Sequence, residues 1–205
     1  HCLPEFKLEI WNNLVFVNLS GDAESLATRY QGMQKYLEPY KLDTFTEGNA
    51  DGIEVWQSNW KLAMENAMES YHLFRVHKST LETVTPTKEA FYIEGHAPWT
   101  ITAGKMKNIG LDGLTGKLLG AFMDKQRLSH YLLISLPPSF VGILNYDSFG
   151  YLSVHPKKAD ECVIRAGYIS PKKGKASKSE SEFTAAFFAE DKAICERNQR
   201  AMKSR

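Results

Sequence analysis

The sequence predicts an α+β fold that combines an antiparallel β-sheet with a long helix at the C-terminal end of the chain. The first observation is a succession of segments between residues 90 and 169 that are rich in aromatic and β-branched side chains and are separated by Gly, Pro, Asp or Asn. The second is the helical spacing of apolar residues from 179 to 204, and the third is a similar pattern that begins near residue 59. Strand-like segments that follow one another in this way favour a meandering antiparallel sheet.

The beginning of the chain is expected to form a β-hairpin over residues 5–19. Its residues alternate between polar and apolar around Asn12 and Asn13, and asparagine tolerates the positive φ that a tight hairpin turn requires. A connecting helix is expected next, beginning at Asp22, which can cap it, and running as far as Leu37. Between these two residues the apolar side chains recur at helical spacing.

The remaining elements are one long helix and a series of strands. A strand over residues 52–57 should lead into the long helix, which Ser58 or Asn59 caps and which continues into the mid-seventies. Residues 107–128 hold four glycines and are interpreted as a mobile flap. The lysine-rich residues 172–178 are interpreted as a solvated loop, with recruitment of an acidic partner as the alternative. Six further strands are expected near residues 90–95, 99–106, 129–136, 140–146, 149–154 and 161–169.

The composition excludes several classes of function. With 205 residues, 43% of them hydrophobic, the chain can bury a substantial core, and its formal net charge of +1 gives no footprint for a nucleic acid or an anionic membrane. The most apolar stretch, residues 131–144, is interrupted by two prolines and is too short to cross a bilayer. The three cysteines are far apart and fit a reducing cytoplasm better than a disulfide framework. Small organic molecules are therefore the expected partners.

Potential metal ligands gather in the helical pattern that follows residue 59. Glu65, Glu69 and His72 fall at i, i+4 and i+7, and therefore on one face of a helix. His72 and His77 are five residues apart, which on a regular α-helix separates them by about 140°. They can bind one metal only if the helix deforms or ends, for example near residues 74–76. Taken alone, the pair is weak, and packing or simple exposure is the alternative.

The order Asn-Trp-Lys, Glu-Asn, Glu, Tyr-His and a second His over residues 59–77 resembles the iron-binding helix of Rieske-type non-haem iron oxygenases, in their large (alpha) subunit. The resemblance implies a two-histidine, one-carboxylate site in which His72 and His77 bind Fe(II) and leave positions open for dioxygen. The third ligand is expected at Asp191, because the residues from Glu190 to Gln199 are similar to the family's C-terminal helix. The implied fold is the helix-grip form, in which the antiparallel sheet wraps around that helix.

The resemblance also implies roles for residues beside the ligands. Glu69 is expected to lie between His72 and a histidine of a Rieske cluster and to link the two centres for electron transfer. A carboxylate that accepts the N–H of an imidazole fixes its tautomer and ring plane, although a surface position for Glu69 is the alternative. Asn66 is expected to support the ligands without touching the metal. Glu in place of the more frequent Asp is similar to the branch of the family that includes carnitine monooxygenase.

The chain offers no ligands for a Rieske cluster of its own. It contains no Cys-x-His and Cys-x-x-His pairs, which would supply the two-cysteine, two-histidine ligation of a [2Fe–2S] centre. It also begins without Met or a signal-like segment, so it is expected to start inside a longer protein that carries the cluster upstream, and the alternative is a protein that has lost the cluster. Residues 1–40 are predicted to be the last hairpin of the Rieske domain with a connecting helix, and residues 41–205 the mononuclear-iron catalytic domain.

The activity that the resemblance implies is reductive activation of O2. Electrons from a reductase or ferredoxin would pass through Rieske clusters to the iron, and a mono- or dioxygenase in aromatic compound catabolism would hydroxylate an aromatic or related substrate. A homotrimer in the cytoplasm is expected, with no nucleic-acid or membrane partner. The alternatives are a quaternary-amine monooxygenase of the same family, a helix-grip module that only binds an apolar ligand, and a zinc hydrolase. The last is disfavoured because the sequence has no His-Glu-x-x-His pattern.

Overall fold

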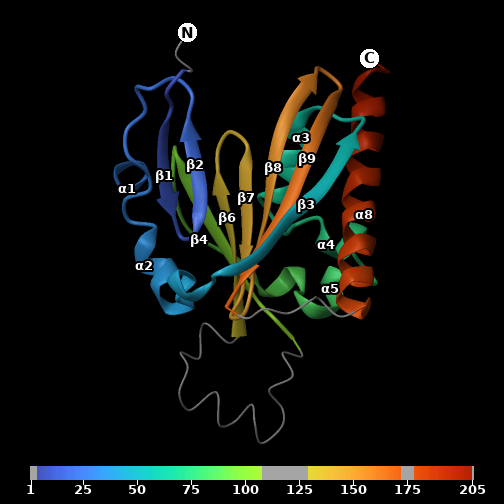
Figure 1. Cartoon of the computed structure of the whole chain (residues 1–205). Helices are drawn as coiled ribbons and strands as arrows, with labels where there is room; N and C mark the ends of the chain where they lie inside the picture. Colours follow the sequence, from blue (N-terminus) through green and yellow to red (C-terminus); the bar gives the residue numbers. More distant parts are fainter. Residues whose placement is uncertain (1–3, 108–128, 172–177, 205) are drawn as a thin grey trace, which may run out of the picture.

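A computed structural model describes residues 4–107, 129–171 and 178–204 of the chain. The expected flap over residues 107–128 and the lysine-rich loop therefore lie almost wholly outside the described residues. The described part consists of a seven-stranded sheet, a two-stranded hairpin and a C-terminal helix, α8 (Lys178–Met202), together with several short helices (Figure 1). This arrangement confirms the predicted α+β class. Within the described ranges, no helix combines the length and the hydropathy that a membrane span requires.

The large sheet is antiparallel throughout, and its strand order is β3-β9-β8-β7-β6-β5-β4. Strands that follow one another in the sequence are neighbours from β4 to β9, as the predicted meander requires, and β3 joins the sheet by pairing with β9. β3 begins earlier than expected, and its pairing is irregular between Asn49 and Gly52. The strands are β3 (Glu47–Trp56), β4 (Ala90–His96), β5 (Trp99–Lys105), β6 (His130–Leu136), β7 (Phe140–Leu144), β8 (Phe149–Lys158) and β9 (Glu161–Ser170).

The predicted hairpin is present as β1 (Lys7–Trp11) and β2 (Leu14–Asn18). Asn12 and Asn13 form its turn with φ angles of 48° and 63°, the left-handed conformation that the sequence indicated. The hairpin packs against one face of the sheet, whereas α8 lies along the other (Figure 1).

Each face of the sheet has its own hydrophobic core, because successive side chains of a strand point to opposite faces. In β6, Ile134 belongs to the core under the hairpin and Leu133 to the core under α8. The first core also includes Trp99 and Phe149, and it is closed by the segment around α2 (Gln34–Leu37) and the following turns η1 (Glu38–Tyr40) and η2 (Leu42–Thr44). The second core is covered by α8 and by α3 (Trp60–Ala67).

The prediction of one continuous connecting helix over residues 22–37 is wrong. The structure has two single-turn helices, α1 (Leu26–Arg29) and α2, and Ser25 rather than Asp22 caps the first of them. Gly32 lies between them with a φ of 85°, a left-handed conformation that interrupts a right-handed helix.

The long helix expected from residue 59 into the mid-seventies is also interrupted. Asn59 caps α3 (Trp60–Ala67), as predicted, by accepting the backbone N–H of Lys61 at 2.9 Å. The helix then ends, and a separate single turn follows as α4 (Leu73–Val76), so the break comes before His72 rather than near residues 74–76. Two short helical segments that the sequence did not indicate follow it, α5 (Leu81–Val84) and η3 (Thr87–Glu89).

Side chains within the break explain why the helix stops. Glu69 accepts the backbone N–H of Tyr71, two residues ahead, and the Ser70 hydroxyl bonds the hydroxyl of Tyr131 on β6 at 3.0 Å. Local side-chain acceptors of this kind compete with the helical hydrogen-bond pattern. The consequence for the site is that His72 and His77 bracket a one-turn helix.

Candidate metal centre

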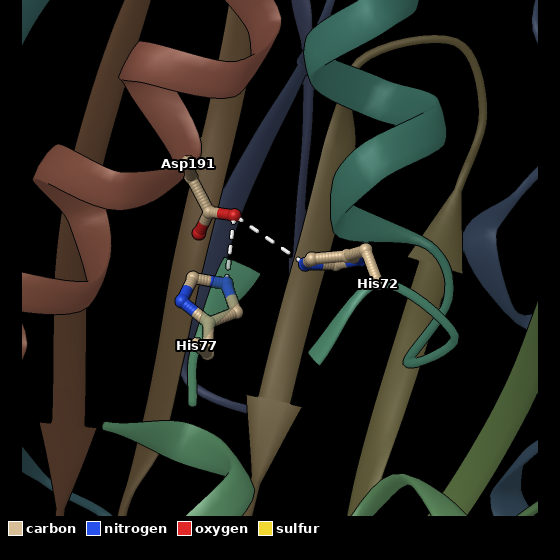
Figure 2. Close-up of side chains that lie close together, drawn as sticks. All are labelled: His72, His77 and Asp191. Carbon is tan, nitrogen blue, oxygen red and sulfur yellow. Dashed lines mark hydrogen bonds and ion pairs between the residues drawn. The ribbon is translucent and has the colours of Figure 1, made fainter. Parts of the chain in front are cut away.

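Three side chains that the sequence singled out lie together in the structure. His72 precedes α4, His77 follows it, and Asp191 extends toward both from α8 (Figure 2). The Oδ1 atom of Asp191 is 2.9 Å from Nε2 of His77 and 3.4 Å from Nε2 of His72. One possible ligand atom from each residue lies within 4.8 Å of the others. Among the described residues, this is the one group of three or more potential ligands.

The single turn of α4 brings the two imidazoles to one centre. The His77 backbone N–H bonds the carbonyl of Leu73, but its φ of −104° and ψ of 36° are no longer helical. The angular separation of a regular helix therefore does not apply, and the two ring centroids are 5.1 Å apart. The irregularity that the five-residue spacing demands is supplied by the break before His72 and the helix end at His77.

Each imidazole has its other nitrogen against a glutamate. Nδ1 of His72 is 2.5 Å from Oε1 of Glu69, and Nδ1 of His77 is 2.7 Å from Oε2 of Glu190. A carboxylate at Nδ1 favours the tautomer that carries its proton there, which leaves the Nε2 lone pair for a metal. Both histidines thus present Nε2 toward Asp191.

Asp191 is held in place by a further donor. The Nδ2 amide of Asn66 on α3 donates a hydrogen bond to Oδ1 of Asp191 at 2.7 Å. Asn66 therefore contacts a candidate ligand. Its role toward a metal stays a prediction.

Two polar side chains of α8 set that helix against the start of α3. Glu196 accepts the backbone N–H of Gln57 at 3.0 Å, and Gln199 accepts the backbone N–H of Asn59 at 2.8 Å. These N–H groups precede α3 and have no partner within the helix. The contacts link the register of α8, and with it the position of Asp191, to the helix that leads to His72. Both residues belong to the motif from Glu190 to Gln199, but the sequence did not indicate this role for them.

The charges of the group are strongly coupled. Burial by itself lowers the pKa of His72, but the hydrogen bonds and charges of Asp191 and Glu69 outweigh it and raise this pKa to about 9. The pKa of His77 is raised in the same way, chiefly because Asp191 and Glu190 outweigh its burial. Burial raises the pKa of Asp191, but the two imidazoles overcome it and hold this pKa below its usual range. Without metal, the site holds protons where a divalent cation could replace them, so its donor set fits such an ion.

Two contacting residues were not assigned by the sequence. Glu190 appeared only as the neighbour of Asp191 in a motif, and Thr80 carried no signal, yet the Thr80 hydroxyl donates to Glu190 at 2.6 Å. The described residues His96, His130 and His155, to which no role was given, are not members of the group.

Comparison with known proteins relates the chain to oxygenases. Residues 34–205 match the family model described as the ring hydroxylating alpha subunit (catalytic domain). A curated relative, the glycine betaine monooxygenase oxygenase subunit of Chromohalobacter salexigens, is 25% identical in an alignment over 149 residues that covers 63% of this chain and 33% of the relative.

Solved structures agree with the fold. A quaternary ammonium Rieske monooxygenase superposes with a TM-score of 0.75 at 16% identity, covering 97% of this chain and 52% of that one. Naphthalene 1,2-dioxygenase from Rhodococcus sp. superposes with a TM-score of 0.71 at 17% identity, covering 96% and 54%. The chain spans about half the length of these two proteins and about a third of the curated relative.

Proposed function

This chain belongs to the ring-hydroxylating alpha subunits, whose catalytic domain it matches over residues 34–205, and from that premise we propose that it activates dioxygen at a mononuclear Fe(II) ion. The proposed ligands are His72, His77 and Asp191. The observation that carries the proposal is the convergence of two Nε2 atoms on one carboxylate oxygen. Bound there, the iron would supply the site at which O2 is reduced beside an organic substrate.

The three residues would hold the metal in a way that suits this chemistry. Two imidazoles and one carboxylate leave further positions open for dioxygen. Glu69 would keep the Nε2 lone pair of His72 directed at the metal by accepting the Nδ1 proton of this histidine. Asn66 would limit the rotation of the Asp191 carboxylate.

The proposed substrate is an aromatic or related organic compound, oxidised by a mono- or dioxygenase reaction. A quaternary amine is the second candidate. It is favoured by the likeness to a glycine betaine monooxygenase and to a quaternary ammonium Rieske monooxygenase, and by the presence of Glu at position 69. A cytoplasmic location and a part in aromatic compound catabolism remain predictions.

We place the entry of electrons at Glu69. Its side chain is 43% exposed and also bonds His72. Glu69 therefore connects the surface to a candidate ligand. Tyr71, with 76% of its surface exposed, contacts the exposed Phe74 edge to face, and the two rings offer an apolar contact surface. We propose that the protein is a homotrimer in which the Rieske [2Fe–2S] cluster of a neighbouring subunit docks here. A reductase or ferredoxin would supply the electrons to that cluster. The structural relative with quaternary ammonium activity has been described in terms of inter-subunit electron transfer.

We further propose that residues 1–40 are the last hairpin of the Rieske domain of a longer protein with a connecting helix, and that the catalytic domain is 41–205. The hairpin supports this assignment, because the face that points away from the sheet is apolar and exposed. Six large side chains on it would be covered by the rest of the Rieske domain: Phe6, Leu8, Ile10, Val15, Val17 and Leu19. Exposed patches of this kind commonly mark interaction sites. The other face, through Trp11, Leu14 and Phe16, packs on the sheet.

Iron quantification on purified variants tests the site. His72→Ala, His77→Ala and Asp191→Ala should each lose most of the bound iron while the circular dichroism spectrum stays that of a folded protein. His155→Ala, at an exposed histidine on β8 that is not part of the group, should keep its iron. Full iron occupancy in the Asp191→Ala protein would remove Asp191 from the ligand set.

A further inference from the structure

We propose that Glu190, together with Thr80, is the positioning residue for His77 and fixes the ring through which this histidine would bind the metal. The inference rests on the proposed iron site, in which His77 is a ligand. It assigns to Glu190 a function that is separate from that of Glu69, because the two glutamates hold different histidines in different surroundings.

The geometry places both nitrogens of one imidazole against consecutive residues of α8. Oε2 of Glu190 is 2.7 Å from Nδ1 of His77, and Oδ1 of Asp191 is 2.9 Å from Nε2 of the same ring. A metal held by His77 and Asp191 would therefore have two of its ligands set by one turn of one helix. Any shift of Glu190 would rotate the ring relative to Asp191.

Burial makes this contact hard to replace. The side chain of His77 is 0% exposed, so its Nδ1 proton has no access to solvent and needs an acceptor within the protein. Leaving such a donor unpaired costs about 1–3 kcal/mol. Glu190 itself is 29% exposed and approaches the buried ring from the solvent side. Glu69, by contrast, is 43% exposed, and its partner His72 is partly open to solvent.

Thr80 completes the arrangement by orienting the carboxylate. Its hydroxyl donates to the same Oε2 atom at 2.6 Å, and its backbone N–H bonds the carbonyl of His77 at 3.1 Å. Thr80 is itself buried and stands immediately before α5. The segment after His77 therefore folds back on it, and one carboxylate oxygen ties this segment to α8.

The test measures Fe(II) binding by the intact protein after removal of the metal, using competition with a chromophoric chelator. Glu190→Gln keeps the size and an acceptor oxygen but removes the charge, Glu190→Ala removes both, and Thr80→Val removes only the hydroxyl. We expect Glu190→Gln to weaken Fe(II) binding by about 10- to 100-fold, Glu190→Ala to weaken it further, and Thr80→Val to weaken it less. Glu65→Gln, at an exposed glutamate of α3, is the matched control and should bind as the parent does.

A spectroscopic readout separates positioning from a general loss of stability. The electron paramagnetic resonance signal of Fe(II) with nitric oxide should change shape in Glu190→Gln, because its ligand geometry changes, but not in Glu65→Gln. Unchanged affinity and an unchanged signal in Glu190→Gln and Thr80→Val would overturn the proposal, even if Glu190→Ala fails to fold. His77→Ala distinguishes the two levels of inference: normal Fe(II) binding in this variant would refute the iron site itself. Loss of binding in His77→Ala with no effect in Glu190→Gln would refute only the positioning role.

Discussion

At the scale of single residues, the two pairs of histidine and glutamate in the site differ in their exposure to solvent. Glu69 is nearly half exposed beside His72, whereas Glu190 bonds a fully buried ring of His77. Both carboxylates can fix a tautomer, but an exposed one can also contact a partner. We therefore expect Glu190→Gln to affect metal binding and Glu69→Gln to affect electron transfer.

Glu69→Gln in the intact protein is expected to slow electron transfer from the reduced cluster to the iron while most of the iron stays bound. Glutamine keeps the size and an acceptor oxygen but loses the charge that favours the proton on Nδ1 of His72. The rate, followed by single-turnover absorbance, should fall about tenfold or more, within the range for such partners of metal ligands. Product formed at the parent rate would mean that Glu69 only packs at the surface and that electrons enter elsewhere.

The raised pKa values of the histidines predict opposite effects of pH on the metal-free and the metal-bound protein. His72 has a pKa of about 9 in the folded protein against its usual 6.5, so the proton stabilises the fold fully below pH 6.5. That stabilisation is lost as pH rises through about 9, and the pKa of His77 shifts in the same direction. The melting temperature of the metal-free protein should therefore fall between these two values.

Metal affinity should rise over the same range, because a metal must displace these protons. Titration with Fe(II) at several pH values, in parallel with the melting curves, checks both trends. An affinity that does not change between pH 6.5 and 9 would show that the protons do not occupy the metal positions.

At the scale of elements, breaks in helices decide where functional side chains lie. α3 ends at Ala67 because Glu69 and Ser70 turn to other partners, and the single turn of α4 then carries a histidine at each end. On the other face of the sheet, a break also separates α1 from α2, and there its cause is the left-handed conformation of Gly32.

Gly32→Ala is expected to destabilise the fold by about 1–2 kcal/mol, the cost of a left-handed conformation for a residue with a Cβ. Space is not the cause, because the nearest atom to such a Cβ would be an ordinary 3.8 Å away on Trp99. Gly150→Ala, where a Cβ would meet nothing within 4 Å and φ is not positive, is the control and should change stability little. Urea denaturation measures both variants. A gain of stability in Gly32→Ala would instead favour one continuous helix from Leu26 to Leu37.

At the scale of the whole molecule, the sheet separates two environments. Its hairpin side covers a hydrophobic core that includes Trp99 and Phe149, and its other side carries α3, α4 and α8 with the candidate site between them. Glu69 is partly exposed on that second side and contacts His72, which is why we propose it as the point where electrons enter.

The 205-residue chain by itself is expected to show no product formation coupled to NADH when it is mixed with a reductase. It contains no cysteine and histidine pairs for a Rieske cluster, so the electrons would have no carrier to the iron. The intact protein, assayed beside it with the same reductase and substrate, is the positive control. NADH-coupled turnover by the isolated chain would contradict the proposed route.

The sequence by itself determined the α+β class, the strands from β4 to β9 and the hairpin turn at Asn12 and Asn13, and it limited the cap of α3 to Ser58 or Asn59. These features depend on local preferences and on periods of two or 3.6 residues, which neighbouring side chains carry. The motif also singled out His72, His77 and Asp191, through resemblance to a family rather than through spacing.

Only the tertiary structure decided where the long helix breaks and what the ligands touch. Ser70 leaves the helix for Tyr131, 61 residues away, and His77 meets Glu190 and Asp191 at separations of 113 and 114 residues. Thr80 became part of the site because α8 packs beside it, and nothing in its own surroundings in the sequence indicates this. Contacts over such separations depend on how the sheet orders its strands and where α8 crosses it. A local pattern of side chains cannot specify them, because the same pattern fits many packings.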